Sequence, residues 1–169
     1  RGLEVLPSTL RNSLSAVTMS NDRTLVLGKK SAVSFMSSDG PRWWGAADLA
    51  RPQDSAVKSI NRMAQWQFAN AYEAEYARTF GNAVSDSTLL TEAIMQAKAP
   101  AADFGTDSNG DLGGRLRTLA SVLPYFRQRG YRRQVFLVNW GRFDTHANQR
   151  GSGDETQDTQ LPVVAKALA

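Results

Sequence analysis

Hydrophobic positions along the chain follow two different periods. Near the N-terminus, residues 14–19, 24–27 and 32–36 are short runs of strand-forming residues separated by Asn, Asp and Gly, which favour turns. We expect three short strands in this part of the chain. From residue 54 onward, apolar residues recur at steps of three and four, which is the period of an amphipathic helix.

Four helices are expected, at about residues 54–81, 86–99, 111–129 and 161–169. Asp54 is placed to cap the first helix and Gly81 to end it. Pro100 would stop the second helix, and Gly130 would stop the third. Apolar residues at this spacing indicate that each helix packs one face against a core.

The run 134–140, Gln-Val-Phe-Leu-Val-Asn-Trp, is nearly continuous in apolar residues. Such a run is typical of a parallel strand that is covered on both faces. A helix, a short turn, this strand, a polar loop and another helix follow one another here. That order indicates the α/β class, with a parallel sheet and packing helices.

The amino-acid composition limits the structural class of the protein but does not indicate an activity. The 169 residues are 41% hydrophobic and 21% charged, which excludes wholesale disorder and a fibrous repeat. The chain has no cysteine, so disulfides, a thiolate nucleophile and a cysteine-based zinc site are excluded. A formal charge of +4 permits a polyanionic partner but does not require one. No stretch approaches the roughly 20 apolar residues of a membrane helix.

The polar segment 141–149 directly follows the predicted buried strand. In open α/β sheets, ligands bind beyond the carboxyl ends of the strands. Asp144 and His146 are two residues apart, so in extended backbone their side chains project to the same side. A carboxylate beside a neutral imidazole suits zinc or another divalent metal. Asn148 or Gln149 could add an oxygen ligand or orient one.

A plainer interpretation is that His146 lies in a polar loop, hydrogen-bonds to Asp144 and has no function. Short Asp-x-His matches arise easily by chance, and two ligands do not complete a metal site. The polar neighbours argue against a histidine buried in the core.

Two stretches within residues 111–149 carry a family resemblance. They read Asp-Leu-Gly-Gly-Arg-Leu-Arg-Thr-Leu-Ala and Arg-Gln-Val-Phe-Leu-Val-Asn-Trp-Gly-Arg-Phe-Asp-Thr-His-Ala-Asn-Gln. This resembles a bacterial family catalogued as domain of unknown function 1501. That family has Leu-Arg-x-x-Ala on a helix, then a strand, then Gly-Gly-Phe-Asp-Thr-His with Gln three residues later. The family is grouped with the alkaline phosphatase and sulfatase superfamily. The resemblance therefore implies a partial alkaline-phosphatase-like sheet with packing helices and short N-terminal strands.

The resemblance also assigns roles to individual residues. It implies that Asp144 and His146 are ligands of a divalent metal such as zinc, and Gln149 matches the family's Gln. Arg142 departs from the pattern because it replaces the second Gly of Gly-Gly-Phe. At positive φ this Arg would cost about 1 kcal/mol or more. Alternatively, it could face the site and pair with a small anionic ester substrate.

The implied parent protein is a metal-dependent hydrolase of phosphate or sulfate esters. It would be exported by the twin-arginine route to the periplasm or the cell exterior, with its signal outside these residues. The family's upstream Asn-Asp segment and downstream Thr-Asp-His-Gly motif are also absent from the sequence. We therefore interpret residues 1–169 as an internal fragment of a single domain, truncated at both ends and inactive without the rest of the site. The alternative is a secreted binding or scaffold protein that keeps the fold without catalysis.

Three further patterns favour ordinary structural roles. Residues 107–111, Asp-Ser-Asn-Gly-Asp, begin like a calcium loop, but Leu112 stands where Gly is needed. We expect a turn there, with Asp111 capping the next helix.

Four arginines cluster near the end of the third helix, at Arg127, Arg129, Arg132 and Arg133. They could bind nucleic acid, but helix C-termini favour cations in any case, so no nucleic-acid partner is expected. Three tryptophans could form a ligand platform but are expected in the core, at Trp43, Trp44 and Trp66.

Overall fold

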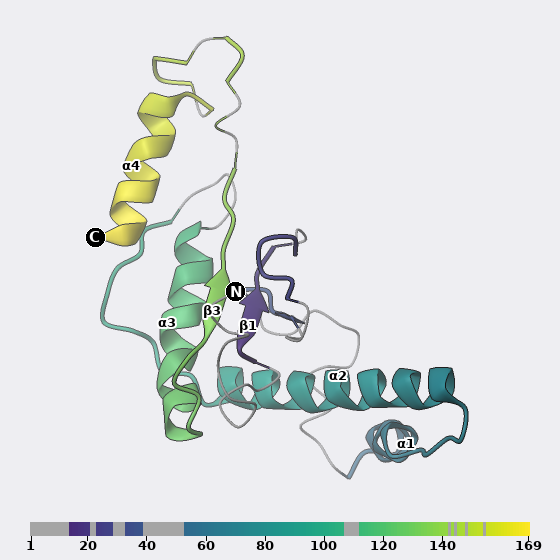
Figure 1. Ribbon diagram of the computed structural model, residues 1–169. Helices are drawn as coiled ribbons and strands as arrows, with labels where there is room; N and C mark the ends of the chain where they lie inside the picture. The colour runs from purple at the N-terminus through teal and green to yellow at the C-terminus, as the bar shows by residue number, and fades with distance from the viewer. Residues whose placement is uncertain are drawn as a thin grey trace.

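The computed structural model describes residues 14–20, 23–28, 33–38, 53–106, 112–141, 143, 145–147, 149–153 and 155–169. Its elements are, in order, β1 (Ala16–Thr18), β2 (Ser34–Phe35), α1 (Ser55–Ala64), α2 (Ala71–Met95), α3 (Leu112–Gln128), β3 (Val135–Leu137) and α4 (Gln157–Leu168). Within these residues the fold is mixed α/β, with four helices and a small parallel sheet of three strands (Figure 1). The predicted α/β class is confirmed at this level.

The three strands lie in the order β2-β1-β3, and both pairings are parallel. Val17 of β1 is in register with Ser34 on one side and Phe136 on the other. Because all strands run the same way, their carboxyl ends share one edge of the sheet. At that edge the Met36 N–H donates to the Thr18 carbonyl at 3.0 Å, and the Met19 N–H donates to the Leu137 carbonyl at 2.8 Å.

Burial differs from the prediction for β3. The sequence predicts that this strand is covered on both faces, yet Val135 is 45% exposed. Phe136, on the opposite face, stacks on Phe126 of α3 with ring centroids 6.5 Å apart, because side chains alternate between the two faces of a strand. Within the described residues β3 lies at the edge of the sheet, and β1 is the strand whose residues are all buried.

The run 24–27 is wrong as a strand prediction. The N–H groups of Val26 and Leu27 both donate to the Arg23 carbonyl, at 3.0 and 2.9 Å, which closes a turn. Leu25 and Leu27 are exposed. A sheet position would have given these apolar side chains a partner, whereas the turn leaves them in solvent.

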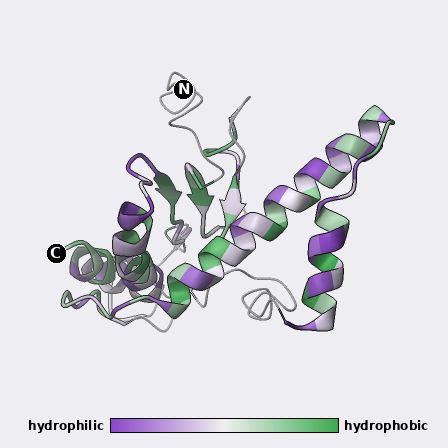
Figure 2. Cartoon of the chain, turned by 90° about the horizontal axis from the view of Figure 1, so that it is seen from below, coloured by the Kyte–Doolittle hydropathy of each residue, from purple (hydrophilic) through white to green (hydrophobic). Residues whose placement is uncertain are grey.

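The predicted helix 54–81 is two elements. Asp54 caps α1 as expected, since its Oδ1 accepts from the Ala56 N–H at 2.8 Å. The helix ends at Ala64, and Asn70 caps α2 by accepting from the Tyr72 N–H at 2.9 Å. The break lets α1 fold back against α2 as a helical hairpin (Figures 1 and 2).

Gly81 does not end a helix, because α2 runs through it to Met95. Its lack of a side chain serves helix packing instead. A β-carbon at this position would lie 3.0 Å from the Ala64 carbonyl oxygen at the end of α1. The predicted separate helix 86–99 is therefore the second half of α2, and it stops five residues before Pro100.

α3 matches its prediction closely, with Pro124 inside it. Gly130 then adopts φ +85°, a left-handed conformation that favours glycine. The Tyr131 N–H donates to the Phe126 carbonyl at 2.9 Å and closes the helix end. α4 begins at Gln157, earlier than expected, so Pro162 lies beyond the first turn.

Two clusters of buried residues hold the described elements. The sheet core joins β1 to α2 and α3, and its buried members are Leu14, Val17, Met19, Met36, Leu90, Ala93, Leu119, Val122, Tyr125 and Phe126. The hairpin core lies between α1 and α2 and consists of Val57 and Val84, with Ile60, Ala64 and Phe80 packed against them. Figure 2 shows α2 extending from beside the sheet to the distant end where α1 folds back.

A buried hydrogen bond fixes α2 to β2, an outer strand of the described sheet. The Ser34 hydroxyl of β2 donates to the Asp86 carboxylate at 2.8 Å, and both residues are at most 8% exposed. Hydrogen bonds to a charged group are stronger than neutral ones. Among the described residues, no helix combines the length and apolar character needed to cross a membrane.

Candidate functional site

The chain that leaves β3 carries the site residues predicted from the sequence. It departs from the carboxyl edge of the parallel sheet and runs toward the N-terminal end of α4 (Figure 1). We call residues 138–153 the β3–α4 segment. Its position agrees with the expectation that the polar loop follows the carboxyl end of a parallel strand, where ligands of α/β proteins commonly bind.

Contacts near the strand hold the first part of the β3–α4 segment. Arg115 of α3 donates from Nη1 to the Asn139 carbonyl at 2.7 Å. Further along, the rings of Trp140 and Phe143 meet edge to face with centroids 5.3 Å apart. The Thr145 N–H donates to the Phe143 carbonyl at 2.8 Å, which forms a tight turn just before His146.

His146 and Gln149 have different surroundings from those of a closed metal site. His146 is exposed, so it is not a core histidine and its imidazole is accessible from solvent. Gln149 is also exposed, and its Nε2 donates to the Thr145 carbonyl at 3.2 Å. That bond gives Gln149 a role in closing the turn around His146.

Three of the predicted site residues lie outside the described residues. They are Arg142, Asp144 and Asn148. The predicted pairing of Asp144 with His146, the role of Arg142 and a ligand role for Asn148 therefore stay predictions. The calcium-like segment 107–111, including the cap role of Asp111, also lies outside, as do Trp43 and Trp44.

The β3–α4 segment also contains two buried polar atoms. The Thr145 Oγ1 and the Trp140 Nε1 are inaccessible to solvent, and neither has a hydrogen-bond partner within the described part of the chain. A buried polar group left unsatisfied costs about 1–3 kcal/mol. Thr145 directly precedes His146, and Trp140 lies six residues before it. The part of the segment around His146 therefore contains polar atoms that could still form hydrogen bonds.

The far end of the segment is fixed to α4 by charge. The Asp158 carboxylate accepts from the Gly151 N–H at 2.9 Å and from the Arg150 Nε at 2.9 Å. The Gly151 N–H, followed by the Arg150 guanidinium, holds the pKa of Asp158 below its usual value. Asp158 therefore stays ionised, and its bonds tie the segment to the first turn of α4.

The donor set fits a divalent metal only in part. An accessible imidazole is a suitable ligand for zinc, which prefers nitrogen, sulfur and carboxylate oxygen. Within the described part of the chain, no group of three or more His, Asp or Glu side chains is placed to hold a metal ion. Asp144 is not among those residues. The described residues thus offer one imidazole toward a metal.

Within the arginine cluster, Arg129 makes contacts that join two helices. Arg129 pairs with Glu92 of α2 at 3.1 Å, and its guanidinium lies over the Tyr125 ring, 5.1 Å from the centroid. Arg127 and Arg132 line a cavity of about 450 Å³ together with Leu123, Tyr131, Gln134 and Phe136. Arg129 therefore joins α3 to α2, which agrees with the structural interpretation of this arginine.

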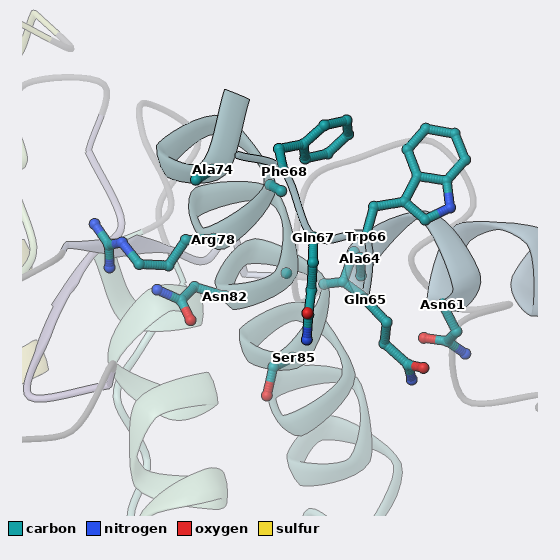
Figure 3. Close-up of a pocket in the computed structure, with 13 residues that line it drawn as sticks. Asn61, Ala64, Gln65, Trp66, Gln67, Phe68, Ala74, Arg78, Asn82 and Ser85 are labelled. Atoms are coloured by element: carbon teal, nitrogen blue, oxygen red, sulfur yellow. The ribbon is translucent and has the colours of Figure 1, made fainter. Parts of the chain in front are cut away.

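A cleft that the sequence pattern does not predict lies between α1 and α2. Trp66, expected in the core, is 52% exposed and lies in the segment that connects the two helices. This cleft has a volume of about 700 Å³ (Figure 3). The signal in the sequence is the run Gln65-Trp66-Gln67, where two amides flank an indole at a break in the helical period.

Comparisons of the sequence with protein-family models and with curated proteins, and of the fold with solved structures, give no match. The resemblance to the domain of unknown function 1501 family therefore remains a prediction based on the motifs of residues 111–149.

Proposed function

We propose that the protein is part of a metal-dependent hydrolase of phosphate or sulfate esters with an alkaline-phosphatase-like fold. The carrying observation is the position of its motif. The segment with Asp144 and His146 directly follows the carboxyl end of a parallel strand, and His146 is accessible to solvent. This is the place where α/β proteins bind ligands.

The chemistry of the motif supports a divalent metal such as zinc. A carboxylate and a neutral imidazole are common zinc ligands, and a metal would polarise an ester oxygen and generate a nucleophile from water. Asp144 and His146 would be two of several ligands, with the others supplied from elsewhere in the parent domain. Arg142 is suited to pair with the anionic group of the ester. The same family resemblance supports export to the periplasm or the cell exterior.

Metal analysis tests this proposal. The full-length protein and its variants Asp144→Ala and His146→Ala are equilibrated with zinc, dialysed and examined by elemental analysis. We expect stoichiometric zinc in the wild type and its loss in both variants, because each removes one ligand. Asp103→Ala is the matched control. Asp103 is an exposed carboxylate that pairs with Lys166 at 3.0 Å, so its removal should leave zinc binding unchanged.

Two outcomes would contradict the metal site. One is a wild-type protein without bound metal, and the other is a pair of variants that retain it. In the wild type with metal, hydrolysis of p-nitrophenyl phosphate and p-nitrophenyl sulfate distinguishes the two ester classes.

A non-catalytic binding protein that keeps the fold is the second candidate. The observation that favours it is the cleft between α1 and α2, which has an exposed tryptophan and several polar side chains. Absence of metal together with ligand binding at this cleft would support the second candidate over the first.

A further inference from the structure

Uncharged polar side chains and apolar residues share the lining of the cleft between α1 and α2. Five of the lining side chains are polar and uncharged. Three come from α1 and the segment after it, and two come from α2: Asn61, Gln65, Gln67, Asn82 and Ser85. None of these side chains makes a hydrogen bond within the described part of the chain. In Figure 3 the Gln67 side chain extends in the direction of Ser85. Four amides and a hydroxyl therefore offer their donors and acceptors to the same cleft.

Aromatic rings adjoin these amides. Trp66 and Phe68 line the cleft, and their rings meet edge to face with centroids 6.1 Å apart. Trp66 is 52% exposed and Phe68 is 38% exposed. This aromatic pair presents an apolar surface next to hydrogen-bonding groups.

The cleft offers no uncommitted charge among its described lining residues. Arg78 is its charged member, and its guanidinium donates to the Glu75 carboxylate at 2.8 Å. This contact lowers the pKa of Glu75 and raises that of Arg78. The two charges therefore compensate each other one helical turn apart, and the remaining lining residues are neutral.

We propose that this cleft binds a neutral oligosaccharide. A sugar ring has an apolar C–H face that can stack on an indole, and its hydroxyls both donate and accept hydrogen bonds. Side-chain amides also donate and accept, so each can pair with one or two hydroxyls. The volume of about 700 Å³ lies within the range of about 300–1,000 Å³ that is usual for small-ligand sites. This assignment is independent of the proposed metal site.

The same lining argues against other ligand classes. An anionic or cationic ligand would find no unpaired charge of opposite sign among the described lining residues. A purely apolar ligand would remove solvent-accessible amides from water, and leaving them without hydrogen-bond partners is costly. A polyhydroxylated ligand would offer hydrogen-bond partners to these amides and also cover the aromatic pair.

A glycan array probed with the intact chain tests the proposal, followed by titration calorimetry with the neutral oligosaccharides that bind. We expect saturable binding of at least one neutral glycan. Trp66→Ala should weaken it about two- to tenfold through loss of stacking. Gln67→Ala should weaken it by a similar factor, about two- to tenfold, through loss of a hydrogen bond. Tyr72→Ala is the matched control, because Tyr72 is an 89% exposed aromatic of the same hairpin outside the cleft lining.

Three results would overturn the proposal. They are the absence of binding to every neutral glycan, equal affinities of wild type and Trp66→Ala, and binding confined to sulfated glycans that weakens steeply with salt. All three substituted residues are exposed, so the variants should keep the fold, and circular dichroism checks this. A negative metal analysis would leave these results unaffected.

Discussion

The sheet core and the hairpin core differ in how many elements they unite. The sheet core joins strand residues near the N-terminus to α2 and α3, and its central side chains are fully buried. The hairpin core is formed by two helices that are neighbours in sequence and has two buried members, Val57 and Val84. Burial of apolar surface is the main source of stability. We therefore expect the sheet core to contribute most of the folding free energy, and the hairpin to contribute less.

The largest effect is expected from Phe126→Ala in the sheet core. Phe126 is 0% exposed, and its ring contacts those of Tyr125, Tyr131 and Phe136. Removing it should lower the free energy of unfolding by about 3–5 kcal/mol, because a large cavity remains. Urea denaturation followed by circular dichroism measures the change. Leu123→Ala, at a 44% exposed position of the same helix, is the control and should cost much less. Equal losses would contradict a dominant sheet core.

A smaller and more local effect is expected from Val57→Ala in the hairpin core. Val57 is 1% exposed on α1 and packs against α2. The substitution should cost about 1–3 kcal/mol. Hydrogen exchange should quicken in residues 55–64 while protection of β1 and α3 stays unchanged, since regions can open separately. Loss of protection throughout the molecule would show instead that the two cores unfold together.

The smallest effect is expected for Tyr125, a residue of the sheet core whose hydroxyl links α3 to α2. Burial, followed by the hydrogen bond that it donates to Glu92 Oε2 at 2.6 Å, raises the pKa of Tyr125 to about 12. The unfolded chain releases this proton near pH 10. Between about pH 10 and about pH 12 the folded state therefore binds more protons than the unfolded state, and stability falls as pH rises.

Tyr125→Phe isolates that contribution. The variant should lose about 0.5–1.5 kcal/mol at neutral pH, because the hydrogen bond to Glu92 is gone. Above pH 10 the difference between wild type and variant should shrink. Urea denaturation at a series of pH values measures both quantities. A difference that stays constant up to pH 12 would argue against the raised pKa.

Local signals in the sequence account for most of the elements. Asp54 and Gly130 mark helix ends through side-chain capping and positive φ, which depend on a few neighbouring residues. The position of the candidate metal segment after β3 also follows from local patterns. In contrast, the role of Gly81 depends on the approach of α1, which is tertiary packing and has no local signature.

The cleft and the buried strand β1 show a second limit of prediction from the sequence. The most buried strand, β1, contains Thr18, whose hydroxyl is satisfied locally because it accepts from the Ser20 N–H and donates to the Ser20 carbonyl. The more apolar run at β3 lies at the edge of the described sheet. Hydrophobicity alone therefore does not predict which strand is fully buried. The hydrophobic character of Trp66 likewise predicts a core position, although its side chain is 52% exposed in the hairpin.

The absence of a β-carbon at Gly81 allows α1 and α2 to approach each other closely. At Gly81 the backbone of α2 comes so near to Ala64 that even an added β-carbon would be crowded. A larger side chain at this position would push α1 away from α2. Because Gly81 and Ala64 both line the cleft, a change in the distance between the two helices would also change the shape of the cleft.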